Sequence, residues 1–214
     1  MGYVFLILLV FFILTTIFFT RDFRGKKIRN IVGHMFFLVS LCLNGKIVLS
    51  QETNIIFYAL SGFVLGLLIF FISLFLTTLS FSEIIAHGLP FSGIFGCFID
   101  RPLRAMTILI ASIVEEFIWR AVIQDYFGRI YLGNLLVNVT LTAFLFSIVH
   151  KRILEGDILK KLEFLLFSLF LGYSFAVTHS LTFVILIHLM RNINIEYRNS
   201  VSLYRMKRTL KQSL

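Results

Sequence analysis

The sequence predicts an all-α membrane protein, a bundle of about seven transmembrane helices. The chain is 58% hydrophobic and only 14% charged, with 26 Phe among its 214 residues. A typical soluble domain is about half apolar and about a quarter charged, and it could not bury this much apolar surface. No long polar stretch or proline-rich linker divides the chain. We therefore expect residues 1–214 to form a single integral membrane domain.

The individual spans follow from apolar runs of about 20 residues, the length needed to cross about 30 Å of hydrocarbon. Seven runs qualify, at residues 2–20, 31–50, 55–80, 105–126, 132–150, 162–177 and 181–195. The second run is interrupted by Asn44 and Lys46, and the sixth is short. Residues 81–104 contain both prolines and are expected to form an interfacial or re-entrant stretch. Asp100 can cap the helix that follows, and Pro102 suits its first turn.

The net charge of +9 has a positional explanation. Lys and Arg gather in four segments, at residues 21–29, 101–104, 151–161 and 198–211. With seven spans, all four segments fall on the same side of the membrane. The positive-inside rule then predicts an external N-terminus and a cytosolic C-terminus. We expect a multi-pass protein of the plasma (inner) membrane, with the lipid bilayer as its surroundings, basic segments that flank its helices and no nucleic-acid partner.

Several ionisable and amide side chains fall inside the predicted spans. They are Glu115, Glu116 and Arg120 in the fourth, His150 at the end of the fifth, and His188, Arg191 and Asn192 in the seventh. A charge at the bilayer centre costs about 3 kcal/mol on insertion scales. Such residues normally face a bundle interior or a wet cavity, so we treat them as a candidate site.

Helical spacing separates the two adjacent glutamates. Glu116 and Arg120 are four residues apart and can pair on one helix face. Glu115 is turned by about 100°, and its own neighbour four residues on is Trp119, which carries no charge. Glu115 is therefore expected to be a desolvated carboxylate with a raised pKa, suited to proton transfer. The alternative is a buried Glu116–Arg120 pair that only fixes helix packing, with Glu115 a bystander.

The depths of these residues in the bilayer indicate that they can meet. At about 1.5 Å per residue, Glu115 lies about 16 Å from the cytosolic end of its span. His188 falls at a similar level, and Asn192 lies one turn nearer the cytosol on the same helix face. His150 lies closer to the cytosolic rim. We expect these four residues to line one cavity that opens inward.

Three motifs occur in order within these spans. Residues 115–120 fit EExxxR, residues 146–150 fit FxxxH and residues 188–192 fit HxxxN. EExxxR is the most specific, whereas an FxxxH is common in so phenylalanine-rich a chain. The ordered set resembles the CPBP family, also called the Abi or CAAX protease and bacteriocin-processing family. This family includes the type II CAAX prenyl endopeptidases, which are glutamate-type intramembrane proteases. The resemblance covers residues 105–195.

The resemblance implies a role for each motif residue. Glu115 would be the general base on a water that His150 helps to hold, and His188 and Asn192 would donate hydrogen bonds to the oxyanion. Glu116 and Arg120 would form a supporting pair, and Phe146 would orient His150. The implied enzyme is a CAAX-protease-like peptidase. It hydrolyses a peptide bond near the C-terminal end of a membrane-associated or peptide substrate, without a cofactor.

Three alternatives remain open at this stage. Two His and two Glu could hold zinc, although the sequence contains no HExxH. A second possibility is a non-proteolytic relative that acts in peptide immunity or assembly. A third is a transporter that uses the same polar residues as a proton relay.

Overall fold

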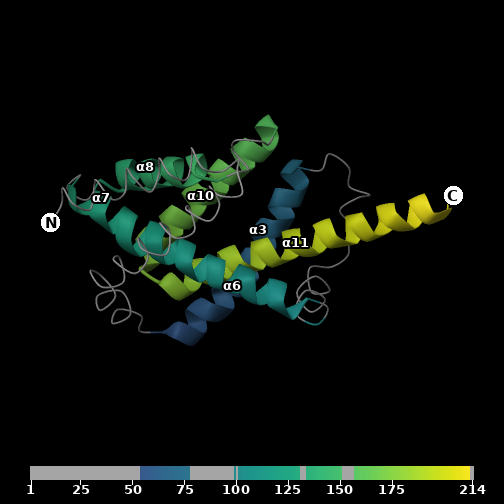
Figure 1. Ribbon diagram of the computed structural model, residues 1–214. Coiled ribbons are helices and arrows are strands. Elements are labelled where there is room, and N and C mark those ends of the chain that lie inside the picture. The colour runs from purple at the N-terminus through teal and green to yellow at the C-terminus, as the bar shows by residue number, and fades with distance from the viewer. Residues whose placement is uncertain (1–53, 78–98, 100, 131–133, 151–156, 213–214) are drawn as a thin grey trace, which may run out of the picture. The chain divides into compact units, whose positions relative to one another are not determined.

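The structure is a computed structural model that describes residues 54–77, 99, 101–130, 134–150 and 157–212. Within these residues it contains helices and no β-strand, which confirms the all-α class for this part of the chain (Figure 1). The predicted spans at residues 2–20 and 31–50, and most of residues 81–104, lie outside the described residues. The count of about seven spans and the orientation of the termini remain predictions.

The described helices belong to two compact units. The first, here called the α8–α10 unit, contains η1 (Phe117–Gln124), α7 (Asp125–Ile130), α8 (Leu135–Ile148) and α10 (Ile158–Thr178). The second, the α3–α11 unit, contains α3 (Ile55–Thr77), α6 (Pro102–Glu116) and α11 (Leu181–Gln212). The boundary between them falls between Glu115 and Glu116, at the end of α6.

Helix α3 has the side-chain pattern of a lipid-facing span. One face is apolar and exposed, with side chains at a spacing of four residues: Ile56, Leu60, Val64, Leu68 and Ile72. Leu67, Phe70 and Leu74 are buried. A helix that is apolar on both faces suits a bilayer better than water. Helices α3 and α10 are both long and apolar enough to cross a membrane.

The segment predicted as the fourth span, residues 105–126, is helical over a longer stretch, from Pro102 to Ile130. Helix α6 begins at Pro102, as predicted, and the Arg101 carbonyl accepts hydrogen bonds from the N–H groups of Arg104 and Ala105 at 3.0 Å each. Proline fits this first position because its missing N–H would have no helical partner there. Asp100, the predicted cap, lies outside the described residues. The helical path continues through η1 and α7 to Ile130.

Helix α8 is shorter than the predicted fifth span at residues 132–150. It has 14 residues, which at about 1.5 Å per residue gives about 21 Å, less than the hydrocarbon thickness. Asn134 caps its start by accepting a hydrogen bond from the Val137 N–H at 3.1 Å. The helix has ended before His150.

Helix α10 is longer than the predicted sixth span at residues 162–177, because a cap starts it at Ile158. Asp157 accepts hydrogen bonds from the side chain of Lys160 at 2.7 Å and from its backbone N–H at 2.9 Å. These bonds hold the pKa of Asp157 below its ordinary value. The helix ends at Thr178, and the residue that caps it, His179, adopts a left-handed conformation and is exposed.

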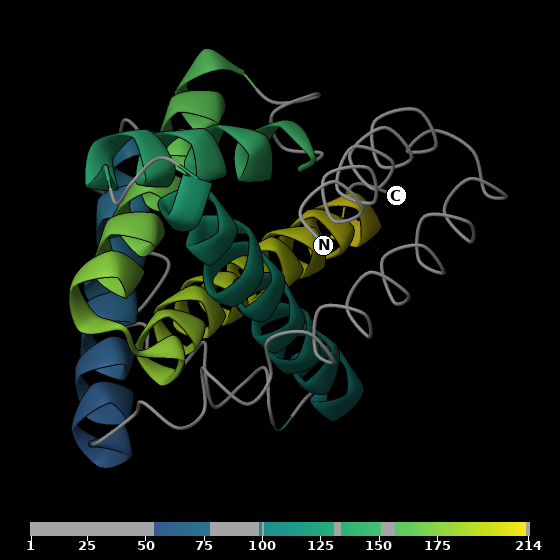
Figure 2. The same cartoon turned by 90° about the vertical axis from the view of Figure 1, so that its left-hand side faces the viewer.

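Within the α8–α10 unit, α8 packs across α10 (Figure 2). Phe146 of α8 stacks on Phe164 of α10 with ring centroids 5.5 Å apart. Gln124 of η1 donates a hydrogen bond to the Gly172 carbonyl of α10 at 2.8 Å. This bond links η1 to α10.

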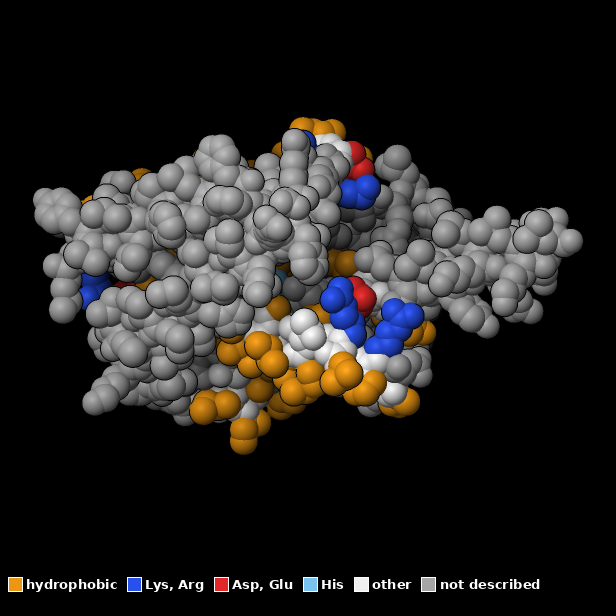
Figure 3. Space-filling view, in the orientation of Figure 1, with side chains coloured by type: hydrophobic (Ala, Val, Ile, Leu, Met, Phe, Trp, Pro, Cys, Tyr) orange, Lys and Arg blue, Asp and Glu red, His pale blue; other side chains and the backbone are white. Residues whose placement is uncertain are grey.

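Within the α3–α11 unit, the three helices share one apolar core. It is formed by Leu67 of α3, Ala105 of α6, and Leu189, Met190 and Ile193 of α11. At the edge of this core Arg104 pairs with Glu196 through two hydrogen bonds of 3.0 and 3.2 Å. Figure 3 shows hydrophobic side chains gathered over α3 and α6, next to a group of blue Lys or Arg and red Asp or Glu side chains. Helix α11 has 32 residues and continues well past the predicted span end at residue 195.

Candidate functional site

Glu115 and His188 lie together in the α3–α11 unit. The Glu115 Oε2 atom is 3.7 Å from His188 Nε2, and the histidine side chain is buried. This distance exceeds a direct hydrogen bond, and a single oxygen atom can form hydrogen bonds to two groups at such a separation. The pair therefore combines a proton acceptor with a donor that can face the same water or carbonyl oxygen.

The two adjacent glutamates differ in burial. The Glu115 side chain is 35% exposed, whereas that of Glu116 is 0% exposed. Glu116 is thus the fully buried carboxylate of the two, and the expectation that Glu115 is desolvated stays a prediction. A general base must be reachable by water and substrate, and the Glu115 side chain is the less buried of the two carboxylates.

The HxxxN motif lies on α11. His188 is buried and Asn192 is partly buried one turn further along the helix. The Asn192 Oδ1 atom accepts a hydrogen bond of 3.4 Å from Nη1 of Arg191, which is itself buried. The amide nitrogen of Asn192 is therefore the end of the side chain that remains to donate elsewhere.

Glu116 and Arg120 form the predicted pair. The Arg120 Nε atom donates to Glu116 Oε2 at 3.0 Å, and both side chains are 0% exposed. The guanidinium lies over the ring of Phe146, 5.2 Å from its centroid. The pairing inferred from the spacing is confirmed, and it lies in the α8–α10 unit. Its depth makes it suited to support and not to contact with a substrate.

Arg120 lies on a segment that the sequence did not reveal. Residues 117–124 form a π-helix, η1, whose eight residues are all buried. π-Helical turns are rare and occur frequently at functional sites. They change the angular position of each following side chain, so the period of 3.6 residues does not hold beyond Glu116. The prediction of a regular α-helix through residue 126 is wrong here, because a backbone with i→i+5 hydrogen bonds depends on the packing around it.

Phe146 and His150 form the FxxxH motif at the end of α8. The two rings are 4.2 Å apart between centroids, and Phe164 lies 4.9 Å from His150. His150 Nδ1 is 2.6 Å from the Phe146 carbonyl oxygen. A carbonyl can only accept, so Nδ1 carries the hydrogen and Nε2 is the atom of the neutral ring that can accept a proton. Phe146 therefore contacts His150 through both its ring and its backbone.

The seven predicted site residues thus fall into two clusters. One contains Glu115, His188 and Asn192 in the α3–α11 unit, and the other contains Glu116, Arg120, Phe146 and His150 in the α8–α10 unit. The prediction that Glu115, His150, His188 and Asn192 line one cavity joins residues of both units and stays a prediction. The described residues contain no group of three or more His, Cys, Asp or Glu side chains that could hold a metal ion.

Two polar residues of the α3–α11 unit received no role from the sequence. Arg191 is 1% exposed, and its Nε atom donates to Ser73 Oγ of α3 at 3.4 Å. Arg191 follows the motif histidine by three residues. Its position inside a predicted span was the sequence signal that could have indicated a role for it. Ser73 gave none, because a single serine in an apolar run is ordinary.

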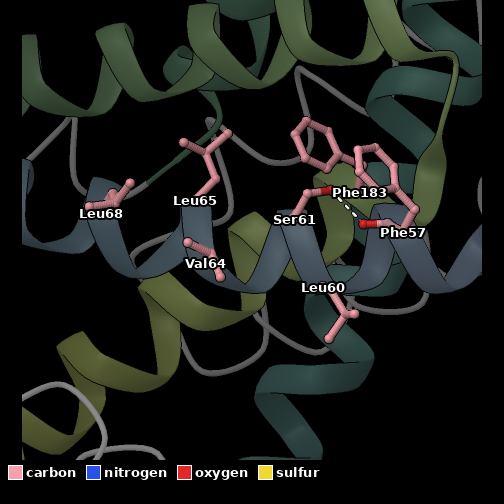
Figure 4. A pocket seen from close by; sticks show the side chains of 7 residues that line it. All are labelled: Phe57, Leu60, Ser61, Val64, Leu65, Leu68 and Phe183. Atoms are coloured by element: carbon pink, nitrogen blue, oxygen red, sulfur yellow. Dashed lines mark hydrogen bonds between the residues drawn. The ribbon is translucent and has the colours of Figure 1, made fainter.

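An open apolar groove on α3 is separate from these polar residues. Its volume is about 500 Å³, and it is lined by apolar side chains of α3 and by Phe183 (Figure 4). Ser61 is its polar lining residue, and the serine hydroxyl donates to the Phe57 carbonyl of the same helix at 2.7 Å. The groove therefore offers no group for acid–base chemistry.

The described part of the chain is thus helical, with two helices long and apolar enough to cross a membrane and a carboxylate–imidazole pair formed by α6 and α11. Residues 100–194 match the family model of the type II CAAX prenyl endopeptidase Rce1-like proteins. This match confirms the family resemblance seen in the motifs, and it covers all three of them. Searches of curated proteins and of solved structures gave no match.

Proposed function

We propose that this protein is an intramembrane endopeptidase that hydrolyses a peptide bond near the C-terminal end of a membrane-associated substrate. The observation that carries the proposal is the Glu115–His188 pair, 3.7 Å apart within the segment that matches the peptidase family. A partly exposed carboxylate beside a buried imidazole supports water activation next to a hydrogen-bond donor.

The proposed reaction begins with a water bound to Glu115. The carboxylate takes a proton from this water as the oxygen attacks the scissile carbonyl carbon, with His150 helping to hold the water. The carbonyl oxygen then carries a negative charge, and His188 and Asn192 donate hydrogen bonds to it. Glu115 passes its proton to the leaving nitrogen as the C–N bond breaks. Each proton is accounted for without a cofactor.

The supporting residues act by holding the site in place. The Glu116–Arg120 pair neutralises two charges at the start of η1, directly after Glu115 in the chain. The Phe146 carbonyl selects the His150 tautomer whose Nε2 can face a water. We further propose a multi-pass protein of the plasma (inner) membrane with a cytosolic C-terminus.

The family name suggests the substrate to try first. A peptide ending in Cys-aliphatic-aliphatic-X with a farnesyl group on the cysteine is the motif that such endopeptidases are named for. The matched control is the same peptide without the prenyl group, because a peptidase that recognises only the peptide would cleave both forms.

Proteoliposomes that contain the purified protein test the proposal. We expect cleavage of at least one of the two peptides, with no proton flux across the vesicle when a pH gradient is imposed. Proton flux without cleavage would favour the transporter. Neither cleavage nor flux, from folded protein, would favour a non-proteolytic role in immunity or assembly.

A further inference from the structure

Helix α3 reaches the candidate site through its close approach to α11. Gly62 and Gly66 form a GxxxG pattern on its buried face. A Cβ atom at Gly62 would lie 2.6 Å from the Phe183 carbonyl oxygen, and one at Gly66 would lie 2.7 Å from Met190 Cβ. The two backbones are thus as close as small residues allow, as is usual for membrane helices.

This approach brings Ser73 within reach of Arg191. The hydroxyl oxygen accepts a hydrogen bond of 3.4 Å from the Arg191 Nε atom. Ser73 is 8% exposed and Arg191 is 1% exposed, so both groups lie away from solvent. A buried guanidinium is costly unless its N–H groups are satisfied, and partners in fixed positions therefore hold it in one conformation.

Arg191 in turn restricts its neighbour Asn192. Its Nη1 atom donates to Asn192 Oδ1 at 3.4 Å. Guanidinium groups have no acceptor, so the atom that faces Arg191 must be the amide oxygen. Without this contact the Asn192 amide could rotate and present its oxygen to the substrate, where it would repel an oxyanion.

We propose that Arg191 is a positioning residue that keeps the Asn192 amide nitrogen available to the oxyanion, and that Ser73 of α3 holds Arg191 in place. This inference rests on the proposed peptidase function. It extends the site to α3, which lies outside the segment that matches the family.

A double-mutant cycle on cleavage of the farnesylated peptide tests the link. Loss of one oxyanion donor lowers kcat by about 100- to 1,000-fold, which sets the expectation for Asn192→Ala. Arg191→Met should lower kcat by about 10- to 100-fold with KM nearly unchanged, because only the transition state carries the oxyanion. In the Asn192→Ala background, Arg191→Met should cause no further loss, since its effect acts through the absent amide.

Variants of the serine separate positioning from packing. Ser73→Ala should lower kcat by about three- to tenfold, and Ser73→Thr, which keeps the hydroxyl, should restore most of it. The matched control is Ser61→Ala, which removes a serine hydroxyl from the same helix but away from Arg191. It should retain wild-type kcat. If Arg191→Met does not fold, Arg191→Gln takes its place in the cycle, because a glutamine amide also has an acceptor and does not require the Asn192 oxygen to face it.

The outcomes distinguish this inference from the proposed function. Additive losses for Arg191 and Asn192, or wild-type kcat for Arg191→Met beside an impaired Asn192→Ala, would overturn the positioning role and leave the peptidase intact. Full activity of Asn192→Ala, or a wild-type protein that cleaves nothing, would overturn the oxyanion assignment and the positioning role with it.

Discussion

The buried Glu116–Arg120 pair allows a quantitative prediction about stability. Its side chains are both 0% exposed and are joined by a hydrogen bond of 3.0 Å. Breaking a buried pair by removal of one charge typically costs about 3–5 kcal/mol, because the remaining ion stays desolvated. Glu116→Gln keeps an oxygen that can accept one hydrogen bond, so we expect the lower end, about 3 kcal/mol.

The environment of Arg120 supports this magnitude. Among the described residues, its Nη1 and Nη2 atoms are buried without a hydrogen-bond partner. The Phe146 ring, 5.2 Å away, is a further contact that favours a cation. A cation–π contact is worth about 0.5–2 kcal/mol, which does not replace a carboxylate.

The assay is thermal unfolding in detergent at fixed protein concentration. About 3 kcal/mol corresponds to a fall in Tm of about 6–12 °C for a protein of this size. Glu196→Gln is the matched control, because it removes the carboxylate of a partly exposed ion pair with Arg104, worth at most about 1 kcal/mol. Glu116→Leu combined with Arg120→Met should recover most of the lost stability, since a buried pair can be exchanged for apolar residues of similar volume. A Tm for Glu116→Gln equal to that of Glu196→Gln would refute the reasoning.

Further predictions concern chemistry, positioning and topology. Prolonged dialysis against a strong chelator should leave cleavage unchanged, and stoichiometric zinc with recovery on zinc addition would contradict a metal-free base. Phe146→Leu keeps the backbone carbonyl that binds His150 but removes the ring beside it, so kcat should fall by about tenfold while the pH profile keeps its shape. Reporter fusions after Leu214 should score cytosolic and those near Gln51 and Arg129 external; an external C-terminus would mean that a span was miscounted.

Contacts within one helical turn could be predicted from the sequence. Glu116 and Arg120 are four residues apart, and this spacing predicted their pairing, which holds although η1 begins at Phe117. The contact between Phe146 and His150, which lies past the end of α8, was implied by the family resemblance. The Pro102 start of α6 was predictable for the same local reason. In each case the partner lies in the same short segment, and no knowledge of packing is required.

Features that depend on packing could not be predicted in the same way. The π-helix at residues 117–124 has no sequence signature, because its hydrogen bonds compete with those of an ordinary helix and the surrounding contacts decide. Ser73 and Arg191 are 118 residues apart, and only the approach of α3 to α11 joins them. The exposure of Glu115 likewise depends on what packs beside α6, which helical spacing does not specify.

A variant of Glu115, the proposed general base, can be used to identify the substrate. Glu115→Gln cannot take a proton from water, so it should bind substrate without turning it over. Purification of this variant from its native membrane, followed by mass spectrometry of the bound peptide, should reveal a C-terminal sequence. Glu196→Gln serves as the control that should carry no such peptide.

The central claim is that Glu115 activates the hydrolytic water. The most direct measurement is turnover per folded molecule of Glu115→Gln beside its Tm, in proteoliposomes supplied with a peptide that the wild-type protein cleaves. We predict a loss of at least about 100-fold in kcat, the lower end for a general base, with a Tm close to wild type because the side chain is 35% exposed. Retained turnover in Glu115→Gln, together with a folded but inactive Glu116→Gln, would contradict the assignment and exchange the roles of the two glutamates.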